Sequence, residues 1–375
     1  MKIGIFKKVA LCLSLAFWLV PSSVPAASLG PDLLRAKKDA ESKGYIFETS
    51  HDEIVAKAKK EGKLRALSGI ERDSIHPMRE AFRKRYPFID VLVEEITGTD
   101  SNQRFLLEIK TGRVKGWDST HLSVDLYNEY APYLKKFDIL GMARQGVLNV
   151  PTQIVDPTRR DTLAIRSNIQ LVAYNKRLIS ADKVPDTWED FLQPDFKGRK
   201  FLADIRPTEI SALVPTWGLE KTLDFARKLA LQEPIWVRGN TRPLASMVTG
   251  EYSLFIGPNF TSVIRAIRKD PTGSLHYKIV EPVPTRFSDA NAVLIGADHP
   301  YGGLLWLEFL VSPEGQKIVD EYEPYGASVF TAGSVQEKLT RGKKLSLVNW
   351  DHFTKMQGYQ AKVVEAYGFP KAAIK

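Results

Sequence analysis

Three arginines stand at the openings of two predicted helices, where they could bind a negatively charged group. Arg206 precedes a helix that is predicted from Thr208, and Arg238 and Arg242 lie at the opening of a second helix. Guanidinium groups recognise carboxylate and phosphate groups, and the free N–H groups at a helix N-terminus also favour anions. The alternative is that these three side chains make surface ion pairs, and the sequence leaves both interpretations open.

Other polar residues follow the predicted strands, at the ends where open α/β sheets bind their ligands. We therefore take the candidate ligand-binding residues from the turns after these strands and from the two helix openings. They are Ser68, Glu71, Arg72, Thr99, Asp100, Arg206, Thr208, Glu209, Arg238, Asn240, Arg242 and Asn259.

Residue patterns typical of enzymes and metal sites are missing from the sequence. No phosphate-binding or dinucleotide-binding glycine loop follows a predicted strand, and neither H-E-x-x-H nor the G-x-S-x-G nucleophile elbow occurs. The six histidines are isolated, and Cys12 is the only cysteine. We therefore predict no catalytic residue, no metal ligand and no cofactor.

The first 26 residues are typical of a Sec signal peptide. Three lysines precede a short apolar run at 9–20, and small residues place the predicted cleavage after Ala26. The run is short for a membrane span, which needs about 20 residues, so an uncleaved anchor is the less favoured alternative. Cys12 follows Leu11 instead of the small residue of a lipobox. An exported chain with no cysteine and no lipid anchor is expected.

The composition and charge are typical of a globular protein. The chain has 375 residues, 43% of them hydrophobic, and 53 Lys and Arg against 44 Asp and Glu. The basic residues are scattered and do not form a stripe with aromatic residues, so no nucleic-acid partner is predicted. A chain longer than about 250–300 residues usually divides its core, so two lobes are expected. A monomer is the expected oligomeric state.

Helices and strands alternate along the chain, a pattern typical of α/β proteins with mostly parallel sheets. Residues 27–50 are predicted to be a polar N-terminal extension with no core face. Strands are predicted at 63–67, 89–96, 122–126, 200–203, 235–237 and 253–256. Helices are predicted at 51–61, 74–86, 102–111, 208–217, 222–231, 242–249, 301–310 and 351–367. Extended segments are predicted at 163–174 and 277–283.

Several of these segments resemble, in the expected order, the bacterial extracellular solute-binding proteins of the type II periplasmic fold. The central signature consists of Tyr174-Asn175-Lys176, the run VPDTWEDF at 184–191 and the run PDFKGR at 194–199. Family-like segments also occur at 61–64, 82–87, 243–252 and 309–316. The resemblance covers about 50–335, and the most similar branch contains binders of iron(III) and related small ligands.

The resemblance implies a two-lobed α/β fold with mixed sheets, flanking helices and a hinged cleft that holds the ligand. Residues 51–165 and 279–375 would form the first lobe, the second part with a C-terminal helical extension, and 166–278 the second lobe. The chain would cross between the lobes near 163–168 and 277–283. By the family's motif, Thr208, Asn240 and Asn259 would hold an anion.

The resemblance further implies a periplasmic protein that captures a small ligand, anionic or anion-assisted, for an ABC transporter permease in the inner membrane. A sensor or chemotaxis binding protein would differ only in its partner. A secreted enzyme on the same fold is the alternative from another functional class.

Iron(III) is a further alternative, for which the sequence lacks the usual donors. Iron binders of the family carry two adjacent tyrosines just after the strand that follows a Gly-Glu pair, whereas here the neighbourhood of Gly250-Glu251 holds Tyr252 alone. Glu71 stands near the position of a histidine ligand in those relatives. Because tyrosinate is the hard oxygen donor that suits this cation, iron would need a non-standard donor set.

Overall fold

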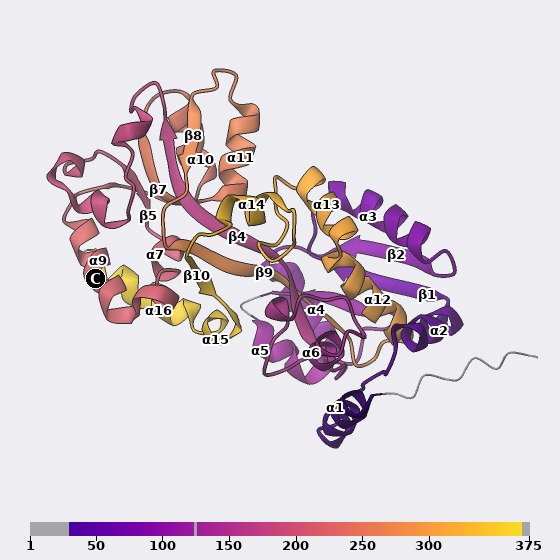
Figure 1. Ribbon diagram of the computed structural model, residues 1–375. Helices are drawn as coiled ribbons and strands as arrows, with labels where there is room; N and C mark the ends of the chain where they lie inside the picture. The colour runs from indigo at the N-terminus through magenta and orange to yellow at the C-terminus, as the bar shows by residue number, and fades with distance from the viewer. Residues whose placement is uncertain (1–29, 124–125, 370–375) are drawn as a thin grey trace, which may run out of the picture.

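The computed structural model describes residues 30–123 and 126–369 of the chain. The predicted signal peptide, 1–26, lies outside the described residues. Two α/β lobes are joined by two long strands, and the indigo and violet part of the chain lies in the first lobe together with the orange helices α12 and α13 (Figure 1). The predicted two-lobed α/β fold is confirmed.

The first lobe is built on a parallel sheet in which β1 pairs with β2 on one side and with β3 on the other. Its elements are α2 (His51–Glu61), β1 (Lys63–Ser68), α3 (Arg72–Arg85), β2 (Asp90–Glu95), α4 (Thr99–Lys110), β3 (Ser119–Leu122), α5 (Tyr127–Tyr130), α6 (Ile139–Arg144), α12 (Pro300–Val311) and α13 (Pro313–Tyr322). Capping residues mark the ends of the helices. The Ser50 side chain accepts a hydrogen bond from the Glu53 N–H at the start of α2, and Gly62 ends this helix with a φ of 68°, which glycine tolerates.

The second lobe has the same plan, with β5 between β6 and β7 and parallel to both. Its elements are β5 (Leu202–Asp204), α7 (Thr208–Ser211), α8 (Val214–Trp217), α9 (Leu219–Ala230), β6 (Ile235–Val237), α10 (Thr241–Val248), β7 (Leu254–Asn259), α11 (Phe260–Lys269) and β8 (Leu275–Lys278). The predicted helix at 208–217 is two short helices. Pro215 lacks an N–H and its ring opposes a continuous helix, so α7 ends at Ser211.

Two antiparallel strands cross between the lobes, β4 (Thr162–Asn175) and β9 (Val283–Val293). They pair with each other from Thr162 to Ile169, and β4 then continues beside β7 and β8 of the second lobe. The crossing predicted near 163–168 lies on β4. The crossing predicted near 277–283 comes too early in the chain, because β8 is a strand of the second lobe and β9 begins at Val283.

The core of the first lobe draws on both ends of the chain. Helix α12 is buried from Gly302 to Val311 and packs on residues from the first 165. Gly302 is required by this contact, since a Cβ there would approach the Lys63 carbonyl oxygen to 2.7 Å. The Phe82 and Trp306 rings, from α3 and α12, lie 5.3 Å apart. The lobe boundaries given above remain a prediction.

The last part of the chain returns to the second lobe. Helix α14 (Val335–Thr340) and strand β10 (Leu345–Val348), which pairs with β9, lead to α15 (Trp350–Phe353) and α16 (Met356–Ala366). The single helix predicted at 351–367 is thus divided in two. The strand predicted at 122–126 also differs, because β3 ends at Leu122.

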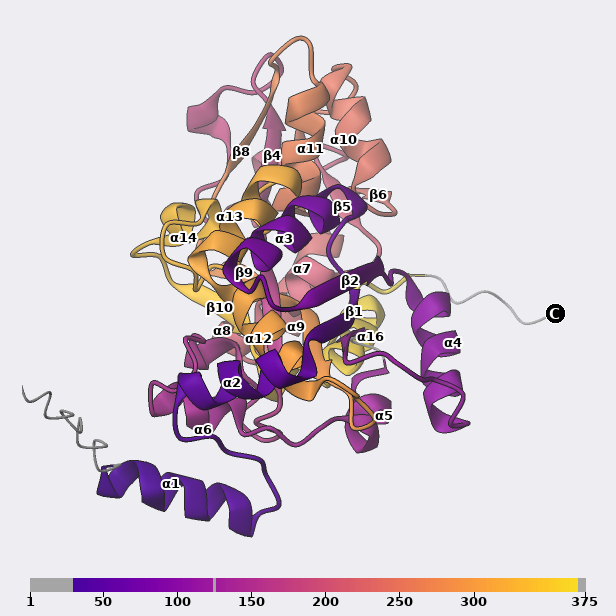
Figure 2. The ribbon, with the colours of Figure 1, turned by 90° about the vertical axis from the view of Figure 1, so that its right-hand side faces the viewer.

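The prediction that 27–50 has no core face is wrong for its described part. Residues Pro31–Ser42 form α1, which lies on the outside of the first lobe (Figure 2). Ala40 and Phe47 are each 1% exposed and belong to the core of that lobe. The charged residues between them hid this pattern, because only a few apolar side chains face inward.

We therefore expect Phe47→Ala to destabilise the protein by about 3–5 kcal/mol, since it empties a buried aromatic site. Leu34, which is 48% exposed on α1, provides the matched control. Leu34→Ala should change the free energy of unfolding by less than about 0.5 kcal/mol. Urea denaturation of both variants measures this difference, and equal effects would contradict the placement of Phe47 in the core.

Candidate functional site

A cavity of about 650 Å³ lies between the two lobes. Its walls come from the end of β3 in the first lobe, from the crossing strands β4 and β9, from the loops of the second lobe and from the C-terminal segment. This volume lies in the range of small-molecule binding sites. The cavity is therefore the candidate ligand site.

Five of the residues singled out in the sequence line this cavity: Arg206, Thr208, Glu209, Asn240 and Asn259. They follow β5, β6 and β7, whose carboxyl ends meet at one edge of the sheet.

Local hydrogen bonds hold these loops of the second lobe in place. The Asp204 carboxylate accepts hydrogen bonds from the backbone N–H groups of Arg206 and Gly239, both at 2.9 Å, and so ties two loops together. Asn259 caps α11 by accepting a 2.8 Å hydrogen bond from the Ser262 N–H. Hydrogen bonds from backbone N–H groups to the Asp204 and Asn259 side chains therefore fix the loops that carry the lining residues.

Six other candidates are not among the residues that line the cavity: Ser68, Glu71, Arg72, Asp100, Arg238 and Arg242. The side chain of Thr99 lies outside the described part of the structure. Ser68 is buried, and the Arg72 guanidinium lies 3.5 Å from the Glu95 carboxylate. Glu71 forms an ion pair with Arg265 of α11, a contact between the lobes.

Strand order explains why the first-lobe candidates lie elsewhere. The order of the strands is β2-β1-β3-β9-β4, so β3 is the strand of the first lobe that adjoins the crossing strands. The turns after β1 and β2 lie one and two strands farther from the crossing strands than the end of β3 does. Arg238 and Arg242 are exposed on the second lobe.

Sequence reasoning missed several lining residues. His121 and Ser123 lie at the end of β3, Gln170 on β4 and Arg286 on β9. Gln170 and Arg286 lie just beyond the segments that were predicted to cross between the lobes, 163–168 and 277–283. One signal was available, because Gln170 is a polar residue inside the apolar run 169–173.

Two arginines and two acidic residues line the cavity. Arg206 and Arg286 both line it, and Asp204 lies 3.3 Å from the Arg206 guanidinium. Burial raises the pKa of Glu209 well above its usual range, and the nearby arginines only partly offset this effect. Burial therefore disfavours the charged form of the Glu209 carboxyl, while the Asp204 carboxylate pairs with Arg206.

Three buried polar atoms at the cavity have no hydrogen-bond partner among the described residues: Gln170 Oε1, Glu209 Oε1 and Arg286 Nε. Gln170 and Glu209 are 2% and 5% exposed. A buried polar atom without a partner costs about 1–3 kcal/mol. All three atoms belong to residues that line the cavity.

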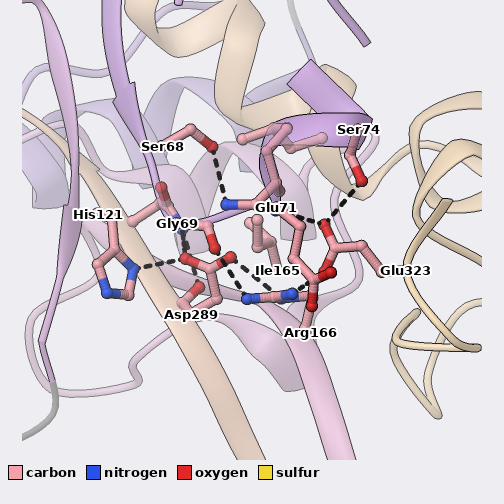
Figure 3. A network of polar contacts seen from close by, with 12 residues as sticks. Ser68, Gly69, Glu71, Ser74, His121, Ile165, Arg166, Asp289 and Glu323 are labelled. Atoms are coloured by element: carbon pink, nitrogen blue, oxygen red, sulfur yellow. Dashed lines mark hydrogen bonds and ion pairs between the residues drawn. The ribbon is translucent and has the colours of Figure 1, made fainter. Parts of the chain in front are cut away.

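A buried network connects the cavity to the crossing strands (Figure 3). His121 Nδ1 lies 2.5 Å from Asp289 Oδ1, and Arg166 Nε lies 3.1 Å from Asp289 Oδ2. Arg166 also pairs with Glu323, whose Oε1 accepts hydrogen bonds from the Ser74 hydroxyl and the Glu71 N–H. The network joins β3, β4 and β9 to the start of α3 and the end of α13.

The electrostatics of this network depend on its arginine. Burial opposes ionisation of Asp289, but the charges of Arg166 and His121 outweigh it and hold the pKa of Asp289 below its usual range. Asp289 has a φ of 61°, which is uncommon for a residue with a side chain. Gly69 packs so closely on Asp289 and His121 that no Cβ would fit. These residues form one tightly packed unit at the crossing.

We expect Asp289→Asn to destabilise the protein by about 3 kcal/mol or more, because it removes one partner of a buried ion pair. A lowered pKa contributes stability that is present above the unfolded value, about 3.9, and is lost as the pH falls through the folded value. The difference from wild type should therefore be constant between about pH 5 and pH 8 and shrink below about pH 4. Urea denaturation across this range measures it.

Asp100→Asn is the matched control, since Asp100 is an exposed carboxylate of the same lobe. It should change the free energy of unfolding by less than about 0.5 kcal/mol. A wild-type advantage over Asp289→Asn that appears only under acidic conditions would contradict the assigned ion pair.

Comparison with known protein families assigns the chain to one of them. Residues 130–356 match the model of the family described as bacterial extracellular solute-binding protein, which is more than half of the chain. The chain belongs to this family. Its members are binding proteins, and this chain is a solute-binding protein of the kind that serves ABC-type importers. No curated protein matches the sequence.

Solved structures with similar folds include several iron-binding proteins. The Trichodesmium protein IdiA (FutA), in complex with iron and citrate, is 19% identical with a TM-score of 0.64; the likeness covers 82% of this chain and 100% of that one. The Bordetella ferric binding protein is 17% identical with a TM-score of 0.63, covering 82% and 100%. The ferric iron-binding protein A of Mannheimia haemolytica, in an open conformation, is 14% identical with a TM-score of 0.63, covering 81% and 98%. At these identities the likeness shows the fold.

None of the helices in the described part of the chain has the length and apolar character needed to cross a membrane.

Proposed function

We propose that this solute-binding protein captures a small anionic ligand in the cavity between its lobes and delivers it to an ABC transporter permease of the inner membrane. The observation that carries the proposal is the pair of arginines, Arg206 from the second lobe and Arg286 from a crossing strand, that line one cavity. Guanidinium groups from separate elements can hold one anion from two directions. The protein would act in the periplasm as a monomer, after signal cleavage following Ala26.

The ligand would carry hydrogen-bond donors as well as an anionic group. Gln170 Oε1 accepts hydrogen bonds only and has no partner in the described structure, and Arg286 lies on the paired strand β9 and lines the same cavity. Glu209 can also accept through its Oε1, which has no partner among the described residues. A hydroxylated or amino-bearing carboxylate or phosphate would satisfy both kinds of group, whereas sulfate, which has no proton to donate, would leave the acceptors without partners.

Iron remains an alternative in the form of an anionic complex. Residues 30–123 and 126–369 contain no group of three or more His, Cys, Asp or Glu that could hold a metal ion. No tyrosine is among the cavity-lining residues of this part of the chain. An iron(III) complex with an organic acid would bring its own oxygen donors and could use the arginines as an anion does. The similar Trichodesmium structure contains iron and citrate.

An enzyme on this fold would turn its ligand over, whereas a transport protein binds and releases it unchanged. The family assignment and the lack of a nucleophile motif favour binding. Stoichiometric binding without a change in the ligand would support the proposal.

We expect Arg206→Ala and Arg286→Ala to weaken anion binding at least tenfold, because each removes a charge-assisted contact. Thermal shift against inorganic phosphate, sulfate, citrate, glycerol phosphate, a phosphorylated amino alcohol and iron(III) citrate identifies the ligand. A ligand at about 100 times its Kd stabilises the fold by about 2.7 kcal/mol, which is easily detected. Calorimetric titration then gives the affinities.

Arg238→Ala is the matched control, since Arg238 lies in the same lobe, is exposed and is not part of the cavity lining. It should bind like wild type. Wild-type affinity in Arg206→Ala and Arg286→Ala, or a ligand set of cations and neutral molecules only, would contradict the anionic assignment. Selection of sulfate over the donor-bearing anions would contradict the role of Gln170 and Glu209.

A further inference from the structure

The segment 349–369 is a third connection between the lobes, in addition to the two crossing strands. It leaves β10, enters the core of the first lobe with α15 and ends on the second lobe with α16 (Figure 1, yellow). Residues on both helices and between them line the ligand cavity on the way. We call this segment the C-terminal strap.

The start of the strap is anchored in the first lobe. Trp350 and Phe353 are 8% and 4% exposed and belong to the core of that lobe. The Trp350 ring centroid lies 5.6 Å from those of Tyr127 and Phe287, and its Nε1–H donates a 3.2 Å hydrogen bond to the Ile154 carbonyl. Buried aromatic contacts and a satisfied indole N–H give this anchor one position.

The end of the strap is anchored in the second lobe. Val363 is fully buried and Tyr367 is 6% exposed, and both belong to the core cluster that contains Ile210. The rings of Tyr367 and Phe369 lie 4.6 Å and 4.8 Å from the Trp236 ring. Helix α16 packs on α7 and α9 of this lobe.

Between the two anchors, the strap forms a wall of the cavity. Met356, Gln357 and Gln360 line it, and the Gln360 amide lies 3.4 Å from the Thr208 hydroxyl, within hydrogen-bond reach. The two glutamine amides can each donate and accept hydrogen bonds. The family match ends at residue 356, so α16 lies beyond the part of the chain that the family model describes.

We infer that the C-terminal strap limits the separation of the two lobes and supplies ligand-contacting residues, Gln357 and Gln360, that select among ligands. A segment that is held at its start by the first lobe, through α15, and at its end by the second lobe, through α16, must release an anchor before the lobes can move far apart. Since α16 also fills one side of the cavity, it limits the size of the ligand. The ligand-contact part rests on the proposed function, whereas the restraint on the lobes does not.

Interspin distances test the restraint without any ligand. Cys12 is the only cysteine of the chain, so a Cys12→Ser background accepts a spin label at each of two new cysteines. Lys60→Cys on α2 and Lys228→Cys on α9 place one label on an exposed site of each lobe. The wild-type strap should give one narrow distance distribution.

Val363→Asp should release the lobe-two anchor, because it puts a charge into an apolar core. A deletion of 356–375 removes α16 outright and keeps Trp350 and Phe353 in the first lobe. Both changes should lengthen the mean distance by several ångströms and broaden the distribution. Lys362→Ala, on the exposed face of α16 beside the buried Val363, is the control and should leave the distribution unchanged.

Hydrogen exchange of α16 establishes whether the anchor is released in Val363→Asp. If the anchor is not released in that variant, the deletion of 356–375 tests the restraint instead. An unchanged distance distribution in the deletion variant, with both lobes still folded by circular dichroism, would overturn the restraint.

Ligand contact is tested with citrate, glycerol phosphate, a phosphorylated amino alcohol and iron(III) citrate as probes. Gln360→Ala should bind the best probe roughly tenfold more weakly, as expected for the loss of one hydrogen bond to a charged molecule, while Lys362→Ala binds it like wild type. Equal affinities for these two variants, with Arg286→Ala still impaired, would overturn the contact and leave the anion site intact. If no probe binds wild type, the proposed function fails with the contact, and the distance measurement still decides the restraint.

Discussion

The antiparallel pairing of β4 with β9 is the constraint on which the rest of the structure depends. These strands carry the chain between the lobes and hold Gln170 and Arg286 at the cavity. Arg166 and Asp289 link the same two strands through a buried ion pair. Since one carboxylate of the network also contacts His121, the hinge and the wall of the ligand site are parts of one packed unit.

The chemistry of the cavity follows from where its charges are buried. Burial disfavours the charged form of Glu209, while Arg206 and Arg286 bring guanidinium groups to the same cavity, and the proposed anionic ligand rests on this arrangement. A charged group in such a site attracts a bound anion more strongly than the same group on the surface would, because charges interact more strongly away from water. Closure of the lobes around a ligand would complete the exclusion of water.

Local sequence patterns predicted part of the candidate site. They could not predict the residues that long-range packing brings to it. Thr208, Asn240 and Asn259 line the cavity, as expected for residues that follow parallel strands, since that rule needs only the order of elements. Ser68 and Asp100 obey the same rule and lie elsewhere, because strand order in space is absent from the local pattern. Arg286 and Gln360 depend on contacts between distant segments, which periodicity and motifs do not encode.

The most direct test of the account is native mass spectrometry of the protein isolated from the periplasm of cells grown in rich medium, in wild-type and Arg286→Ala forms. We predict that wild type carries one small anionic molecule, released intact on unfolding, and that Arg286→Ala carries none. The same molecule retained by Arg286→Ala, or a ligand without a negative charge, would contradict an anion site between the lobes.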